Sequence, residues 1–141
     1  MSDAKHILIG RRGEEIAANL LKNKGYSILY TNWRLGHLEI DIIAANRKEI
    51  VFVEVKTRSS TFGGNPEQAV DRTKKRHMVA AANAFVKYHS EQRNIRFDVI
   101  AILIAKGGEI EDIQHFENAF AAPAVFRTNN SFLPRWRWKH S

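Results

Sequence analysis

Three charged residues stand out because their types and spacing could do chemistry. Asp41, Glu54 and Lys56 each lie in a short segment that is otherwise rich in isoleucine, valine and phenylalanine. Two carboxylates held together in apolar surroundings repel one another, so their pairing needs a reason. A bound divalent cation supplies that reason, since hard cations are held by carboxylate oxygens. Lys56, two residues after Glu54 and on the same face of a strand, would add a positive charge beside the metal.

A β-hairpin is the element that would bring these residues together. Residues 39–43 and 51–56 alternate between polar and apolar, which predicts two strands, with the turn at 46–49 or at its central pair. Either turn gives the same cross-strand pairs, namely Asp41 opposite Glu54 and Glu39 opposite Lys56. A solvated face with an ordinary Glu39–Lys56 ion pair would show the same charges, and spacing alone does not decide between these interpretations.

A third acid can reach this hairpin from a helix predicted over residues 10–24, which Gly25 is expected to end. The apolar stripe of the helix consists of Ile16, Ala17, Leu20 and Leu21. Glu14 lies at the edge of the stripe and can face the protein interior, whereas Glu15 faces water. Both acids also suit the positive end of the helix dipole, so Glu14 alone does not identify a site.

The remaining periodic segments complete an α/β chain. Strands are expected over 26–31, 95–104 and 110–116, a second helix over 67–89, and connections over 32–36 and 58–66. Pro66 suits the start of the second helix. The later connection is rich in glycine and serine, so it could move to admit a substrate or simply join its neighbours. Asp98 is the one acid in its strand and could have a structural role, for instance in a pair with a basic side chain.

The second helix would present a basic surface. Its buried stripe is expected to consist of Val70, Met78, Ala81, Ala82 and Phe85. Lys74 falls within that stripe, so its side chain must extend to solvent or meet an acid. A phosphate-contacting role and a solvated face both fit the cluster of Arg72, Lys74, Lys75 and Arg76.

Composition sets broader limits. The chain has 141 residues, a net charge of +7 and no cysteine. That length suits one domain, expected over residues 1–120, with a basic aromatic tail at 121–141. The charge favours a polyanionic partner such as nucleic acid. The lack of cysteine excludes disulfides and fits a reducing cytoplasm, and no apolar run is long enough to span a membrane.

The order helix, three strands, helix, two strands, with Asp41 and Glu54-Val55-Lys56 on neighbouring strands, resembles the PD-(D/E)XK nuclease superfamily. That resemblance implies an α/β, restriction-endonuclease-like core of αβββαβ order, with a central mixed five-stranded sheet flanked by helices. Ile40 stands where the superfamily has proline before its first acid. Gly10-Arg-Arg-Gly-Glu14 looks most like the archaeal Holliday-junction resolvase branch.

The chain is also similar to the YraN-type family of bacterial proteins, from about Gly10 to Phe120. The matching motifs are Gly13-Glu14, Gly25-Tyr26, Asn32-Trp33-Arg34, Glu39 to Ala44, Phe52 to Arg58 and Arg96-Phe97-Asp98-Val99. Leu38 departs from the family, which usually has glycine before Glu-Ile-Asp. This position belongs to the strand entry and is not a metal ligand.

The resemblance implies a metal-dependent endonuclease acting on DNA phosphodiesters, with branched DNA in repair or recombination as a candidate substrate. Mg²⁺ or Mn²⁺ would be held by Asp41, Glu54, the Val55 carbonyl and Glu14, with Lys56 as a catalytic residue and Glu39 and Gln68 beside the ligands. Nucleic acid would be held by Arg34, Arg58, Arg72, Lys74, Lys75 and Arg76. A homodimer and a repair or uptake complex are further expectations. The alternatives are a non-catalytic nucleic-acid-binding module on the same fold and a subunit active only within a complex.

Overall fold

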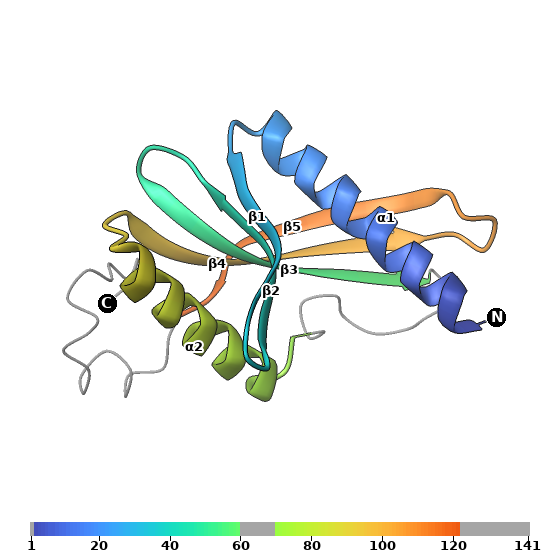
Figure 1. Cartoon of the computed structure of the whole chain (residues 1–141). Helices are drawn as coiled ribbons and strands as arrows, with labels where there is room; N and C mark the ends of the chain where they lie inside the picture. The colour runs from blue at the N-terminus through green and yellow to red at the C-terminus, as the bar shows by residue number, and fades with distance from the viewer. Residues whose placement is uncertain (1, 60–69, 122–141) are drawn as a thin grey trace.

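The computed structural model of the chain describes residues 2–59 and 70–121, and their side chains from Gly10 onward (Figure 1). In chain order the elements are α1 (Ser2–Asn23), β1 (Ser27–Leu35), β2 (Leu38–Ala45), β3 (Glu49–Ser59), α2 (Arg72–His89), β4 (Asn94–Ile104) and β5 (Ile110–Phe120). This is the predicted order of helix, three strands, helix and two strands. The Gln68 side chain, the 60–66 part of the predicted connection and the tail after residue 121 lie outside the described residues.

The five strands form one mixed sheet in the order β1-β2-β3-β4-β5. β3 and β4 are parallel, whereas the β1–β2, β2–β3 and β4–β5 pairs are antiparallel. Strands β2 and β5 therefore run opposite to the other three. The result is an α/β fold with restriction-endonuclease-like element order, as the sequence predicts.

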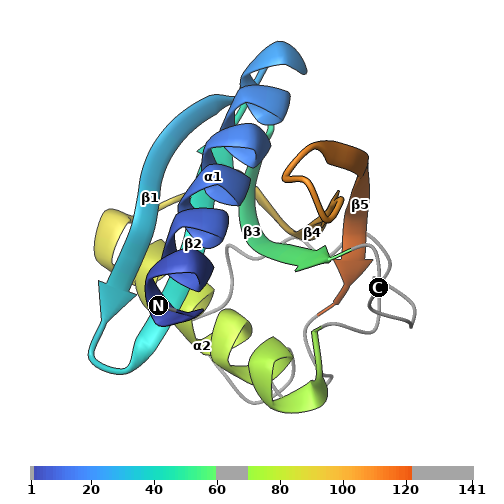
Figure 2. The same ribbon diagram turned by 90° about the vertical axis from the view of Figure 1, so that its right-hand side faces the viewer.

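The two helices cover opposite faces of this sheet (Figures 1 and 2). Helix α2 packs Met78, Ala82 and Phe85 against one apolar cluster, which includes Phe52 of β3. Helix α1 packs Ala17 and Leu21 against the other. Side chains that alternate along β3 and β4 therefore face either α1 or α2, which decides the elements that each charged residue can reach.

Helix α1 begins at Ser2 rather than at Gly10, so its predicted start is wrong. Gly10 does not interrupt the helix, because a single glycine costs only about 1 kcal/mol there. The predicted end is confirmed: Gly25 has φ +98°, and the amide of Tyr26 donates to the Leu21 carbonyl. Gly13 permits a close approach, since a Cβ at this position would collide with Oγ1 of Thr57 on β3.

Strand β1 continues to Leu35, so the connection predicted over residues 32–36 is wrong. A tight turn at Gly36 and His37 follows, with φ +60° at Gly36. Asn32 is a turn-forming residue, so the sequence predicted a connection at a position where the strand continues. It has φ +51° within β1, a left-handed conformation that non-glycine residues rarely adopt.

The β2–β3 hairpin is confirmed with its predicted turn. Asn46 closes it, because its side-chain oxygen accepts hydrogen bonds from the amides of Lys48 and Glu49. Backbone pairing runs from Ala45–Ile50 to Ile42–Val53, in the predicted register. Beyond that last pair the strands separate, and the next residue on each strand is an acid, Asp41 or Glu54.

Helix α2 begins at Arg72, so its predicted start at Glu67 is wrong. Asp71 is the N-cap residue and its carboxylate accepts the amide of Lys74 at 2.8 Å. Val70 is buried but precedes the helix. The predicted buried residues are all buried, together with Val79 and Val86. Within the described residues, neither helix combines the length and the apolar character needed to cross a membrane.

Strand β4 matches its prediction to within one residue, whereas β5 extends past Phe116 to Phe120. The extension contains an irregularity: Phe97 pairs with Phe120, but Val99 pairs with Phe116. Residues 117–119 of β5 therefore stand opposite the single residue Asp98. The alternation of β5 is lost in this bulge, which explains why the sequence placed the end of the strand too early.

Candidate metal centre

Asp41 and Glu54 lie where β2 and β3 separate, and the hairpin fixes both. Oδ2 of Asp41 accepts a hydrogen bond from the backbone amide of Val55 at 2.8 Å. This bond takes the place of regular strand pairing and holds the Asp41 carboxylate beside β3. The interaction of Asp41 with Glu54 contributes to a raised pKa of Glu54, so the predicted proximity of the two acids is present.

Glu54 is buried, with 4% of its surface exposed, on the α2 face of β3. Its Oε2 lies 3.4 Å from Nζ of Lys56, and its Oε1 lies 3.4 Å from Nζ of Lys74. Within the described part of the chain, Oε1 accepts no hydrogen bond. Burial, followed by the neighbouring Asp41, raises the pKa of Glu54 to about 7, despite the opposing effect of the two lysines.

Lys74 confirms the prediction made from its position in the apolar stripe, since it meets an acid. Lys56 likewise lies beside Glu54, as strand alternation predicts. Both ammonium groups are partly exposed, so each can contact Glu54 and an incoming ligand from solvent. The site therefore combines a buried carboxylate with two cations at its mouth.

Glu14 approaches from α1 and is half-buried, whereas Glu15 is exposed, as predicted. Burial raises the pKa of Glu14, and the charges of Asp41 and Glu39 add to the effect. Asp41 is thus a common neighbour of Glu14 and Glu54, which come from the two helix-covered sides of the sheet.

Asn32 is a residue that the sequence argument did not assign to the site. Its side-chain amide donates to Oε1 of Glu14 at 3.0 Å and opposes the rise in the pKa of Glu14. The left-handed backbone of Asn32 accompanies this contact within an edge strand. The Asn32-Trp33-Arg34 motif was visible in the sequence, but its link to Glu14 depends on how α1 packs over β1.

The donor set fits a small divalent cation held by two carboxylates. No group of three or more acidic or histidine side chains is gathered closely enough to enclose a metal among the residues that the structure describes. Mg²⁺ does not need such a group, since it usually keeps several waters and uses one or two carboxylates. Glu54, whose Oε1 accepts no hydrogen bond from the described residues, and its neighbour Asp41 meet that requirement. Glu14 and the Val55 carbonyl stay predicted ligands.

Glu39 lies near Glu14 but pairs with Arg34, at 3.6 Å. The alternative Glu39–Lys56 ion pair is therefore replaced by the Arg34–Glu39 and Lys56–Glu54 pairs. His37 is exposed in the turn between β1 and β2 and packs edge-on against the ring of His77 on α2.

The basic residues predicted to hold nucleic acid occupy different surroundings. Arg72 and Arg76 are exposed on α2, and Arg34 is exposed on β1. Arg58 is half-buried near the end of β3. Lys75 lies over the ring of Phe120, with Nζ 5.5 Å from the ring centroid. The cations of α2 thus begin beside the candidate metal centre and extend to β5.

A second charged cluster lies on the α1 face, centred on Asp98 of β4. Its two carboxylate oxygens accept from Nε and Nη2 of Arg96, Nε2 of His115 and the amide of Asn118, all within 2.9 Å. These hydrogen bonds outweigh burial and lower the pKa of Asp98. The predicted pairing of Asp98 with a basic side chain is confirmed.

The geometry defines an α/β chain of restriction-endonuclease-like order with a partly unsatisfied acid pair at the end of its hairpin. The model of the uncharacterised protein family UPF0102 matches residues 13–102. Relatives include a UPF0102 protein of Porphyromonas gingivalis, 40% identical over 95% of this chain and 98% of the relative. Others come from Parabacteroides distasonis (45% identity; 82% of this chain, 93% of the relative) and Flavobacterium psychrophilum (44%; 83% and 97%). The chain belongs to the UPF0102 family.

Proposed function

We propose that the chain is a Mg²⁺- or Mn²⁺-dependent nuclease of the PD-(D/E)XK type that acts on DNA phosphodiesters. The observation that carries the proposal is the buried Oε1 of Glu54, which accepts no hydrogen bond from the described residues and belongs to a side chain that neighbours Asp41. A buried carboxylate oxygen without a donor costs free energy, so its retention favours an external ligand.

The position of each residue indicates its role in the proposed reaction. Asp41 and Glu54 would hold the cation, with the Val55 carbonyl and Glu14 as the predicted additional ligands. When bound, a divalent metal lowers the pKa of a coordinated water and stabilises charge on the phosphodiester. Lys56 reaches the mouth of the site and can donate from Nζ to the attacking water or to a phosphate oxygen. Arg72 and Arg76 supply cations for the DNA backbone.

Branched DNA substrates and a homodimer, which the nuclease resemblance implies, are part of this proposal. Its rival is a non-catalytic DNA-binding module, and one observation favours that rival. Lys56 and Lys74 already flank Glu54, so ion pairs partly offset its charge without a metal. The two functions differ in whether the protein cuts.

Labelled linear, flapped and four-way-junction DNA, incubated with the purified protein in Mg²⁺, Mn²⁺ or EDTA, separate these functions. We expect cutting that needs the metal and is lost in Asp41→Ala and in Glu54→Ala. Lys22→Gln, on the exposed surface of α1, is the matched control and should cut normally. Salt-sensitive binding without cutting in any metal would reject the nuclease and leave the binding module.

A further inference from the structure

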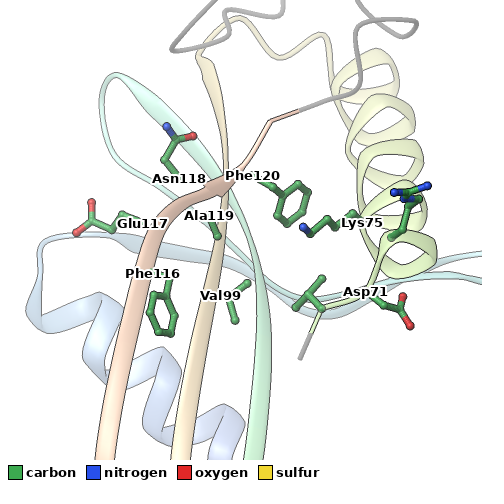
Figure 3. Close-up of a pocket in the computed structure, with 10 residues that line it drawn as sticks. Asp71, Lys75, Val99, Phe116, Glu117, Asn118, Ala119 and Phe120 are labelled. Carbon is green, nitrogen blue, oxygen red and sulfur yellow. The ribbon is translucent and has the colours of Figure 1, made fainter. Parts of the chain in front are cut away.

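A cavity of about 570 Å³ lies between the first turns of α2 and strand β5 (Figure 3). Its wall includes Arg72 and Lys75 of α2, Val99 of β4, and Phe116 and Phe120 of β5. The cavity adjoins the candidate metal centre, because Val99 pairs with Glu54 across the parallel strands. Lys74, the neighbour of Lys75, contacts the carboxylate of Glu54.

The bulge in β5 shapes this cavity. Two aromatic residues, Phe116 and Phe120, bracket the bulge and pack against the α2-side core. Asn118 at its centre has φ +54°, and its amide is held by Oδ1 of the buried Asp98. Bulges of this kind redirect side chains and occur often beside functional sites. A hydrogen-bonded acid on the α1 face of the sheet thus holds the backbone of the bulge between the two phenylalanine residues.

The two acids of the cavity are engaged by other groups, which leaves its two cations to meet a ligand. The Asp71 carboxylate caps α2, and that of Glu117 faces Lys24 and Arg96. Arg72 and Lys75 form no ion pair with any other residue that the structure describes. Figure 3 shows Lys75 and Phe120 directed toward one another across the cavity, with Glu117 pointing away from it.

We propose that this cavity binds one unpaired nucleotide of the nucleic-acid substrate, an inference that rests on the proposed function and narrows its substrate class. The volume is in the range of small-molecule sites, and a base has the flat face that an aromatic ring can stack on. One face of Phe120 already stacks on Phe97, with ring centroids 5.0 Å apart, so the face toward Lys75 would receive the base.

On binding, the nucleotide would replace the contact of Lys75 with the Phe120 ring by a contact with phosphate. Its Nζ now lies over the Phe120 ring, where a base would stack. A phosphate oxygen is a stronger partner for an ammonium group than an aromatic ring near solvent. The base therefore takes the ring, while Lys75 and Arg72 take the phosphate. Single-stranded ends, flaps and junctions offer such a nucleotide, whereas an uninterrupted duplex does not.

Fluorescence anisotropy in EDTA tests this site without depending on cleavage. The probes are labelled oligothymidine and a blunt duplex of equal length. We expect Phe120→Leu, which keeps an apolar side chain in the core, to weaken oligothymidine binding about fivefold or more and duplex binding much less. Lys75→Gln, on the solvent side, should weaken oligothymidine binding more than the matched Lys22→Gln control.

The outcomes separate this site from the nuclease. Equal losses for both probes, or no loss of oligothymidine binding in either cavity variant, would overturn the nucleotide site and leave metal-dependent cutting untouched. Conversely, a protein that never cuts but shows the selective loss in Phe120→Leu would keep the site and reject the nuclease. Asp41→Ala, assayed in parallel, should retain the oligothymidine preference because its side chain lies outside the cavity.

Discussion

Two buried acids on neighbouring strands have pKa values shifted in opposite directions. Asp98 of β4 faces α1 and receives four hydrogen bonds, which lower its pKa. Glu54 of β3 faces α2, has an oxygen that accepts no hydrogen bond from the described residues, and has a pKa raised to about 7. Both lie almost wholly out of solvent, at 0% and 4% exposure.

The difference lies in the donors rather than in the burial. Arg96 offers Asp98 a bidentate contact and is itself held by Glu49 and the Tyr26 hydroxyl. Among the described residues, Glu54 has two ammonium groups as its nearest cations, each at 3.4 Å, and a second acid, Asp41, beside it. A buried acid with all its partners stabilises the fold, whereas a buried acid short of partners is available to a ligand.

The largest expected effect comes from removing the satisfied acid. Asp98→Ala should lower the free energy of unfolding by about 3–5 kcal/mol, because it leaves the buried Arg96 without its bidentate carboxylate partner. Urea unfolding followed by circular dichroism measures this loss. Asp112→Ala, an exposed acid on β5, is the control and should change stability little. A small loss in Asp98→Ala would mean that Glu49 and Glu117 suffice to hold Arg96.

Neutralising the unsatisfied acid should act in the opposite direction. Folded Glu54 keeps its proton up to about pH 7, whereas the unfolded chain releases it near 4.5, so ionisation makes the fold less stable as pH rises through that interval. Glu54→Gln should therefore raise the free energy of unfolding by about 2–3 kcal/mol at pH 8. At pH 4.5 the variant and the wild type should be nearly equal. The same difference at both pH values would contradict this account.

A metal should supply the partner that Glu54 lacks among the residues that the structure describes. At ten times its dissociation constant, Mn²⁺ is expected to add about 1.4 kcal/mol to the free energy of unfolding. The gain should be clear at pH 8 and smaller at pH 5.5, where the metal competes with the proton on Glu54. Thermal unfolding with and without Mn²⁺ measures it. Persistence of the gain in an Asp41→Ala, Glu54→Gln double variant would place the metal elsewhere.

Glu14 lies between Asp98 and Glu54 in its hydrogen bonding, because the side-chain amide of Asn32 donates to it. Asn32→Ala should cost about 1 kcal/mol, because alanine tolerates the left-handed backbone poorly and cannot donate to Glu14. Asn32→Gly should recover most of this stability, since glycine accepts the backbone conformation. If both variants lose the same stability, the hydrogen bond and not the backbone carries the effect. Chemical denaturation distinguishes the two results.

The sequence predicted the features that depend on local patterns of residues, such as strand register and the buried face of a helix. Alternation in β2 and β3 and the Asn46 turn fixed the register that brings Asp41 to Glu54. The position of Lys74 in the apolar stripe indicated that its side chain extends to solvent or meets an acid, and it meets Glu54. The sequence placed Glu54 beside Asp41 and gave Asp98 a structural role, but it could not show how many hydrogen-bond donors each acid receives. Their difference depends on donors from distant segments, such as His115 and Lys74, whose positions follow from tertiary packing.

The parallel pairing of β3 with β4 also has a consequence for how the chain folds. The other strand pairs are neighbours in sequence and can form as hairpins, but Glu49 must find Asn94 across the segment that contains α2. Closing so long a loop before any contact forms is slow. We expect two fast-forming units, β1–β2–β3 and β4–β5, whose joining along β3 and β4 limits the folding rate.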